Sequence, residues 1–241
     1  MLNAARSGQQ SRIVFDANYV YLWRPKIARE TGPLVIRKWE LKLSKMIEFY
    51  YDFVSSASYL AYKRLPGMAE AAGATIRWKP MLLGGLFKAV GNSPPTTIAA
   101  KGKWMFDDQR RTCARHGIAF SLNPKFPMNT VMALRGAIAA ERLGGDLLRP
   151  YMDLMFAGAW ATGADISDPQ VVMEMMTAAG LPAQEIAALV QDQSVKDELR
   201  ANTEEAAARG AFGAPTFFVN DEMHWGQDRL DEVMMAVDKD S

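Results

Sequence analysis

The chain has 241 residues, 49% of them hydrophobic, with 28 basic and 27 acidic side chains. That length fits one large domain or two small ones, and the balanced charge excludes a strong overall attraction to nucleic acid, membranes or acidic partners. No apolar run approaches about 18 residues, so we expect no transmembrane helix. A single cysteine, Cys113, excludes an intrachain disulfide, and with only His116 and His224 beside it we expect no metal site.

The first 45 residues differ in charge from the rest. They hold nine basic and three acidic residues, a net +6, whereas residues 46–241 carry a net −5. Pro25, Gly32 and Pro33 interrupt the short apolar clusters of this segment. We therefore separate a basic N-terminal extension, 1–45, from a domain over 46–241. The extension is interpreted either as disordered or upstream of a natural start at Met46, or as a real arm or targeting segment.

The second segment begins with a βαβ pattern. Residues 46–52 predict a strand because they are rich in aromatic and β-branched side chains. Residues 53–58 predict a turn in which serine can cap a helix, and residues 59–72 predict that helix. Residues 75–80 predict a second strand, which completes the unit.

A block of helices follows this unit. Helices are predicted over 101–116, 129–143, 146–159, 169–179, 181–191 and 194–209. The C-terminal part returns to strands over 216–219 and 222–225, with a tight turn between them, and ends in a helix over 227–237. This order predicts an α/β chain with a thioredoxin-like fold and an all-helical domain inserted at about 98–209.

The reactive residue of such a fold lies after the first strand, at the N-terminus of the first helix. Unpaired backbone amides and the helix dipole stabilise an anion there, typically a thiolate. Redox members carry Cys-x-x-Cys at this place, but this chain reads Ser55-Ser56-Ala57-Ser58. No disulfide can form, so we expect a site for a thiolate brought from outside, with glutathione as the natural candidate. The simpler alternative is that Ser55 only caps the helix.

The loop before the third strand carries a second feature of this fold. Gly213-Ala214-Pro215-Thr216 matches the loop in which a cis-proline faces the reactive helix. The alternative is an ordinary loop proline before an edge strand.

From Met46 onward the chain resembles 2-hydroxychromene-2-carboxylate isomerases, a group of the DsbA-like thioredoxin superfamily that is close to kappa-class glutathione transferases. Five segments carry the resemblance in family order, across about 80% of the chain: 49–60 (FYYDFVSSASYL), 83–92 (LGGLFKAVGN) with Pro94-Pro95, 126–130 (FPMNT), 212–217 (FGAPTF) and 225–230 (WGQDRL). One position departs, because the family carries proline where this chain has Ser56.

The resemblance implies a glutathione site. Ser55 would contact the glutathione sulfur and act as the catalytic residue, and Ala214 would pair with the glutathione peptide as an added strand does. The other end of glutathione would meet Trp225, Gly226, Gln227 and Asp228. Asp228 would bind the γ-glutamyl ammonium, or else serve only as a carboxylate that stabilises the start of the last helix.

The resemblance also implies a substrate site. Its residues would be Lys88, Asn92, Thr97, Ile98 and Phe126. Lys88 would pair with a substrate carboxylate, and Phe126 would stack on a bicyclic ring. The alternatives are a solvated lysine and a core phenylalanine.

The function that the resemblance implies is a glutathione-dependent cis–trans isomerase. It would convert 2-hydroxychromene-2-carboxylate to trans-o-hydroxybenzylidenepyruvate in aromatic hydrocarbon catabolism such as naphthalene degradation. We expect a cytoplasmic homodimer that binds glutathione and a small aromatic carboxylate, without nucleic acid, membrane or metal. Two alternatives stay open: a kappa-like glutathione transferase acting on other electrophiles, and a non-catalytic thioredoxin-like binding module.

Overall fold

The computed structural model describes residues 12–15, 19–23, 34–37 and 45–239. The chain separates into two compact units, Met1–Lys45 and Met46–Ser241. In the first unit, strands β1 (Arg12–Phe15), β2 (Tyr19–Trp23) and β3 (Leu34–Arg37) pair antiparallel in that order. These strands lie in the extension for which the sequence suggested disorder. That the native protein starts at Met46 stays a prediction.

The second unit is built on a four-stranded sheet. Its strands are β4 (Met46–Tyr51), β5 (Thr75–Pro80), β6 (Thr216–Val219) and β7 (Glu222–Trp225), in the order β5-β4-β6-β7. β4 is parallel to β5 and antiparallel to β6, and Tyr50 lies opposite Thr216. The end of β4 therefore meets the start of β6, which brings residues 52–55 and 212–215 to one edge of the sheet.

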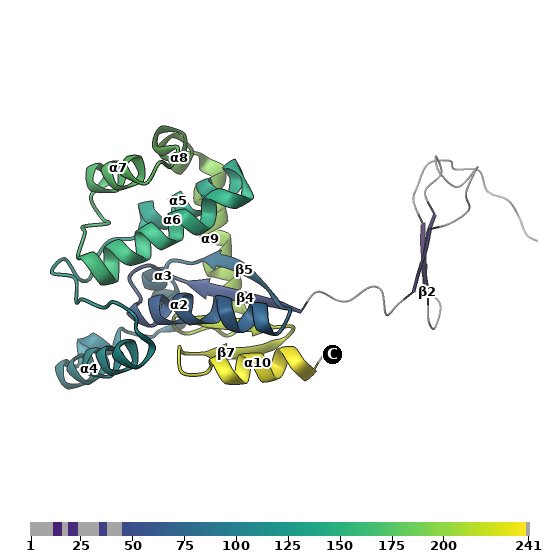
Figure 1. Cartoon of the computed structure of the whole chain (residues 1–241), viewed down its shortest axis with the longest axis horizontal. Helices are drawn as coiled ribbons and strands as arrows, with labels where there is room; N and C mark the ends of the chain where they lie inside the picture. The colour runs from purple at the N-terminus through teal and green to yellow at the C-terminus, as the bar shows by residue number, and fades with distance from the viewer. Residues whose placement is uncertain (1–11, 16–18, 24–33, 38–44, 240–241) are drawn as a thin grey trace, which may run out of the picture. The chain divides into compact units, whose positions relative to one another are not determined.

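Helices cover both faces of this sheet (Figure 1). Successive strand residues point to opposite faces. Phe49 and Tyr51 accordingly belong to the larger core cluster, together with residues of α2 (Ser56–Ala71) and α10 (Leu230–Lys239). Tyr50 packs instead with Ala206 of α9 (Gln193–Ala208) in a second, smaller cluster. The face that carries α2 and α10 is thus opposite the face that carries α9.

The predicted helices are all present, with shifted ends. They are α4 (Ala99–His116), α5 (Val131–Leu143), α6 (Gly145–Ala157), α7 (Pro169–Ala178), α8 (Ala183–Val190) and α9. A π-helical turn over Gly158–Thr162 continues α6, and a 3-10 turn covers Pro95–Thr97. Helix α3 (Leu83–Val90) was not predicted, because it has eight residues and two of them are the weak helix formers Gly84 and Gly85. The expected last helix begins at Leu230 and not at residue 227, so Asp228 precedes it.

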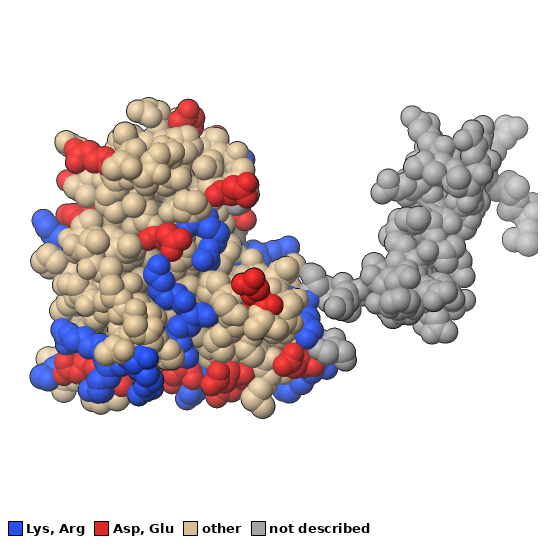
Figure 2. Space-filling view, in the orientation of Figure 1, with Lys and Arg blue, Asp and Glu red and all other residues tan. Residues whose placement is uncertain are grey.

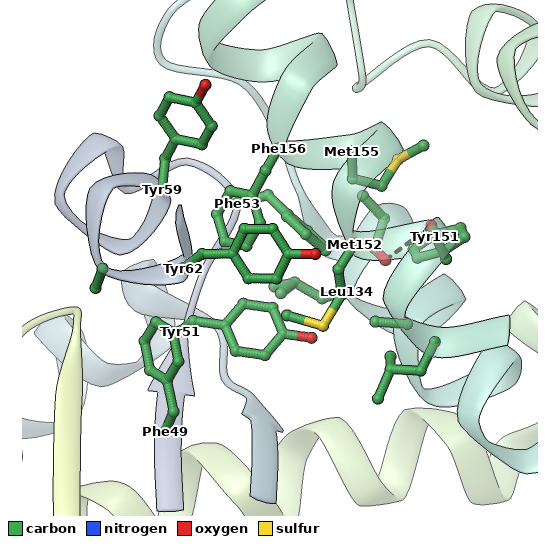
Figure 3. Close-up of a cluster of buried hydrophobic side chains, with 14 of the residues drawn as sticks. Phe49, Tyr51, Phe53, Tyr59, Tyr62, Leu134, Tyr151, Met152, Met155 and Phe156 are labelled. Atoms are coloured by element: carbon green, nitrogen blue, oxygen red, sulfur yellow. Dashed lines mark hydrogen bonds between the residues drawn. The ribbon is translucent and has the colours of Figure 1, made fainter. Parts of the chain in front are cut away.

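An aromatic cluster joins the sheet, α2 and the helical insert (Figure 3). The Phe156 ring of α6 lies 4.7 Å from that of Phe53 and stacks on Tyr62 of α2 at 4.8 Å. The Tyr151 hydroxyl donates to the Ala133 carbonyl oxygen at 2.9 Å, which satisfies the polar end of a buried ring. Because each buried aromatic side chain contributes about 1.5–3 kcal/mol, this cluster fixes the insert against the sheet.

Two surface properties bear on partners. Across the ranges that the structure describes, no helix is both long and apolar enough to cross a membrane. On the face shown in Figure 2, basic and acidic side chains are interspersed along the lower edge. That edge therefore presents no field of a single sign.

Candidate functional site

The loop between β4 and α2 is held by a buried carboxylate. Asp52 is 1% exposed and accepts hydrogen bonds from the Val54 amide at 3.0 Å and the Leu83 amide at 2.8 Å. The Thr130 hydroxyl, just before α5, donates to the same carboxylate at 2.6 Å. Burial raises the pKa of Asp52, and these three hydrogen bonds oppose the rise. Asp52 thus ties the loop to the first residues of α3 and α5.

Two further contacts fix the same loop. The Trp160 indole N–H donates to the Phe53 carbonyl oxygen at 2.8 Å. The Ser55 amide donates to the Asp52 carbonyl oxygen at 3.0 Å. Sequence reasoning named neither Asp52 nor Trp160. For Asp52 the sequence did offer a signal, because it is a carboxylate between two aromatic residues at the end of a predicted strand. A carboxylate buried at such a place needs hydrogen-bond donors around it.

Ser55 lies at the centre of this loop. It is the N-cap of α2, where its hydroxyl oxygen accepts from the Ser58 amide at 3.1 Å. The same hydroxyl donates to the Ala214 carbonyl oxygen at 3.0 Å. Capping is therefore confirmed, and it coexists with a contact to the opposite loop. The Ala57 amide, in the first turn, has no carbonyl partner within the helix.

The opposite loop has the expected backbone form. The Ala214–Pro215 peptide bond is cis, as is Phe126–Pro127. Asn92, directly after α3, donates from its side-chain amide to the Phe212 carbonyl oxygen at 2.7 Å. Asn92, expected in the substrate site, is thus held against the loop that carries Ala214.

Trp225 packs beside the same loop. Its ring centroid lies 4.9 Å from that of Phe212, and the two residues are 47% and 38% exposed. A Cβ on Gly213 would lie 2.5 Å from the indole nitrogen, so this close approach requires glycine. The Gly226 amide donates to the Pro215 carbonyl oxygen at 3.0 Å. Two large, partly exposed aromatic side chains thus lie beside the loop that carries Ala214.

The next two residues lead away from the sheet toward α2 and α10. Arg64 of α2 donates to the backbone oxygen of Gln227 at 2.9 Å and to its side-chain oxygen at 3.0 Å. The Asp228 carboxylate lies 3.1 Å from the Arg229 guanidinium, and its side chain is 60% exposed. Gln227 is therefore fixed, whereas the Asp228 side chain is largely exposed and paired with Arg229.

The residues expected in the substrate site are more widely separated than those expected in the glutathione site. Lys88 lines a hollow between α3, α5 and α9 whose lining does not include Ser55. Thr97 bonds locally to the Pro94 carbonyl oxygen at 2.8 Å, and Ile98 is 50% exposed. Phe126 is half-buried, with its ring 5.4 Å from Phe106 and 5.7 Å from Trp160, which is the core packing kept as its alternative.

Comparisons with known proteins agree with this fold. The model of the DSBA-like thioredoxin domain matches residues 46–238. The 2-hydroxychromene-2-carboxylate isomerase of Sphingobium xenophagum is 30% identical, covering 78% of this chain and 96% of the relative. Human glutathione S-transferase kappa 1 is 26% identical over 78% of this chain and 89% of its own. A solved structure of a 2-hydroxychromene-2-carboxylate isomerase superposes with a TM-score of 0.70 at 26% identity, over 80% and 95% of the two chains.

Proposed function

Because the chain belongs to the DsbA-like thioredoxin family, in the group of 2-hydroxychromene-2-carboxylate isomerases and kappa glutathione transferases, we propose that it is a glutathione-dependent isomerase. Its reaction would convert 2-hydroxychromene-2-carboxylate to trans-o-hydroxybenzylidenepyruvate. The observation that carries this proposal is the hydrogen bond between Ser55 and Ala214 at the N-terminus of α2. It supports a site for a bound thiolate.

The chain's own thiol is unsuited to be the nucleophile. Cys113 lies in α4, is 2% exposed, and burial raises its pKa to about 11. A buried thiol of high pKa is inert at neutral pH because only the thiolate is nucleophilic. Glutathione would supply the thiolate that the chain itself lacks, and the kappa relatives are named for that molecule.

Glutathione binding would rearrange one hydrogen bond. In the structure the Ser55 hydroxyl donates to the Ala214 carbonyl oxygen. A glutathione peptide that adds as a strand would present its own N–H to that carbonyl. The Ser55 hydroxyl would then turn to the glutathione sulfur, where the Ala57 amide and the α2 dipole also favour negative charge. The site would thereby hold the thiolate near neutral pH.

The thiolate would act on the ring-opened form of the substrate. Its sulfur forms a bond to the conjugated carbon, and the double bond becomes a single bond about which the substrate rotates. Elimination then breaks the carbon–sulfur bond, restores the double bond in the trans arrangement and releases the thiolate. Glutathione is unchanged at the end of each cycle, as covalent catalysis requires.

Two groups of residues would position the reactants. Asp228, exposed beside Trp225, would bind the γ-glutamyl ammonium. Around the substrate we place Lys88, Asn92, Thr97, Ile98 and Phe126. Of these, Asn92 is supported by its hydrogen bond to Phe212.

The test is turnover of 2-hydroxychromene-2-carboxylate with and without glutathione, while free glutathione is measured. We expect activity only with glutathione, at constant glutathione concentration. Net consumption of glutathione with turnover would instead support a conjugating transferase, the alternative favoured by the kappa relatives. A protein that binds no glutathione at millimolar concentration would be neither enzyme.

A further inference from the structure

We propose that the hollow between α3, α5 and α9, whose lining contains Lys88 but not Ser55, binds a small organic dianion. Its volume is about 480 Å³, within the range of small-molecule sites. Helix α3 contributes Leu82, just before it, and Gly85, Lys88 and Ala89, and α5 contributes Val131 and Arg135. Helix α9 contributes Lys196, Leu199, Arg200, Thr203 and Glu204.

The charge of this lining is strongly one-sided. It holds four cationic side chains and one carboxylate, that of Glu204. Arg200 is paired with Asp197 at 2.5 Å. Over the part of the chain that the structure describes, Lys88, Arg135 and Lys196 form no ion pair within 4.0 Å. Three cations without an ion pair among the described residues therefore line one hollow, together with a single carboxylate.

Arg135 gives an independent indication. Its Nε atom is buried and has no hydrogen-bond partner among the residues that the structure describes. A buried donor left without an acceptor is unfavourable, and an acceptor from a ligand would relieve it. Guanidinium groups bind planar oxyanions through two parallel hydrogen bonds, so a carboxylate or phosphate fits this position.

The apolar lining sets the rest of the ligand. Leu82, Val131 and Leu199 offer hydrocarbon surface between the cationic groups. Inorganic phosphate would leave that surface uncovered, whereas a ring or short chain with two anionic groups would cover it. An organic dicarboxylate and a phosphate ester share this chemistry.

The experiment titrates the full-length protein with phthalate and with phenyl phosphate. Benzoate, which has the ring but only one anionic group, and inorganic phosphate, which has no apolar part, serve as controls. Isothermal titration calorimetry at low salt gives the affinities. We expect phthalate, phenyl phosphate or both to bind at least about tenfold tighter than benzoate and inorganic phosphate. If phthalate binds more tightly, the ligand is a dicarboxylate; if phenyl phosphate binds more tightly, the ligand is a phosphate ester. Binding of neither at millimolar concentration would overturn the proposal.

Variants of residues inside and outside the lining test whether the ligand binds in this hollow. Lys196→Glu and Arg135→Gln should each weaken binding by about tenfold or more, whereas Lys101→Gln, an exposed cation of α4 outside the lining, should not. Circular dichroism confirms folding, and Lys196→Ala replaces the charge reversal if that variant fails to fold. Lys88 is left intact because it is a proposed substrate residue.

Independence from the glutathione site is tested directly. Ser55→Ala and saturating glutathione should both leave phthalate and phenyl phosphate binding unchanged. Displacement by glutathione, or affinity unaffected by both Lys196→Glu and Arg135→Gln, would place the ligand elsewhere and overturn the proposal. A failure of the isomerase assay would not alter these measurements.

Discussion

Ser55 and Ala214 are 159 positions apart in the chain and are joined by one hydrogen bond, from the Ser55 hydroxyl to the Ala214 carbonyl oxygen at 3.0 Å. The bond exists because β4 and β6 are antiparallel neighbours, so the end of one strand meets the start of the other. It joins the N-terminus of α2 to the backbone at which a glutathione peptide would add. The Ser55 hydroxyl therefore has both a structural and a proposed catalytic role.

Replacing Ser55 by Ala separates these roles. We expect kcat/KM for glutathione-dependent isomerisation to fall by about 10²-fold or more, because a donor to the thiolate is lost. The free energy of unfolding should fall by about 0.5–2 kcal/mol through loss of the cap. The control is Asp168→Ala, which removes the cap of α7, where Asp168 accepts from the Gln170 amide at 2.9 Å. An equal loss of activity in that control would assign the effect to stability alone.

Replacing Ser56 by Pro introduces the residue that the resemblance implies at this position. Ser56 is the first residue of α2, where proline is favoured because its missing N–H has no helical partner. The preceding residue, Ser55, has φ −88° and ψ 107°, which is compatible with a following proline. We expect the free energy of unfolding to rise by about 0.4–1 kcal/mol, with isomerase activity retained. Denaturant titration checks this against Ser56→Ala, which should show no gain. Destabilisation by proline would mean that the loop needs the Ser56 amide.

Thr130→Val removes the hydroxyl that donates to buried Asp52 at 2.6 Å. A buried polar group that loses a hydrogen-bond partner costs about 1–3 kcal/mol, and we expect that loss in the free energy of unfolding at neutral pH. The control is Thr177→Val, whose exposed hydroxyl donates to the Met173 carbonyl oxygen at 2.8 Å. A similar loss in both variants would contradict a special role for Asp52.

The stability of the Thr130→Val variant should also depend on pH in a different way from that of the unchanged protein. Burial raises the pKa of Asp52 in the folded protein above its ordinary value of 3.8. The folded state therefore binds the proton more tightly, and the stability that this contributes below pH 3.8 is lost as pH rises through the folded pKa. Thr130→Val raises the folded pKa further, so its stability should fall over a wider range of pH and by a larger total amount. Unfolding curves from acid to neutral pH measure this, and parallel profiles for Thr130→Val and the unchanged protein would refute it.

Gly213→Ala tests the packing of Trp225. The added Cβ would lie 2.5 Å from the indole nitrogen, so the ring must move from its place beside Phe212. We expect glutathione to bind about tenfold more weakly, with a changed Trp225 fluorescence. Gly67→Ala in α2 is the control, because a Cβ there meets nothing within 4 Å. Unchanged affinity in Gly213→Ala would exclude Trp225 from the glutathione site.

Features that depend on local interactions were predictable from the sequence, whereas contacts between distant residues were not. Local patterns were enough for the strand over Met46–Tyr51, the serine that caps α2, and the hairpin of β6 and β7. The same holds for the absence of cysteine at the reactive position, from which the sequence predicts a thiolate supplied from outside. These features depend on side-chain alternation and on capping between residues a few positions apart.

Only the tertiary structure decided what surrounds Ser55. The donors to Asp52 come from Leu83 and Thr130, and the donor to Phe53 comes from Trp160, 107 positions away. Lys88 lines the hollow between α3, α5 and α9, although the resemblance assigned it to the substrate site. No local pattern encodes such contacts, because they depend on how the helical insert packs against the sheet. That packing comes from burial of the aromatic cluster around Phe156, a non-directional force whose outcome is set by the whole chain.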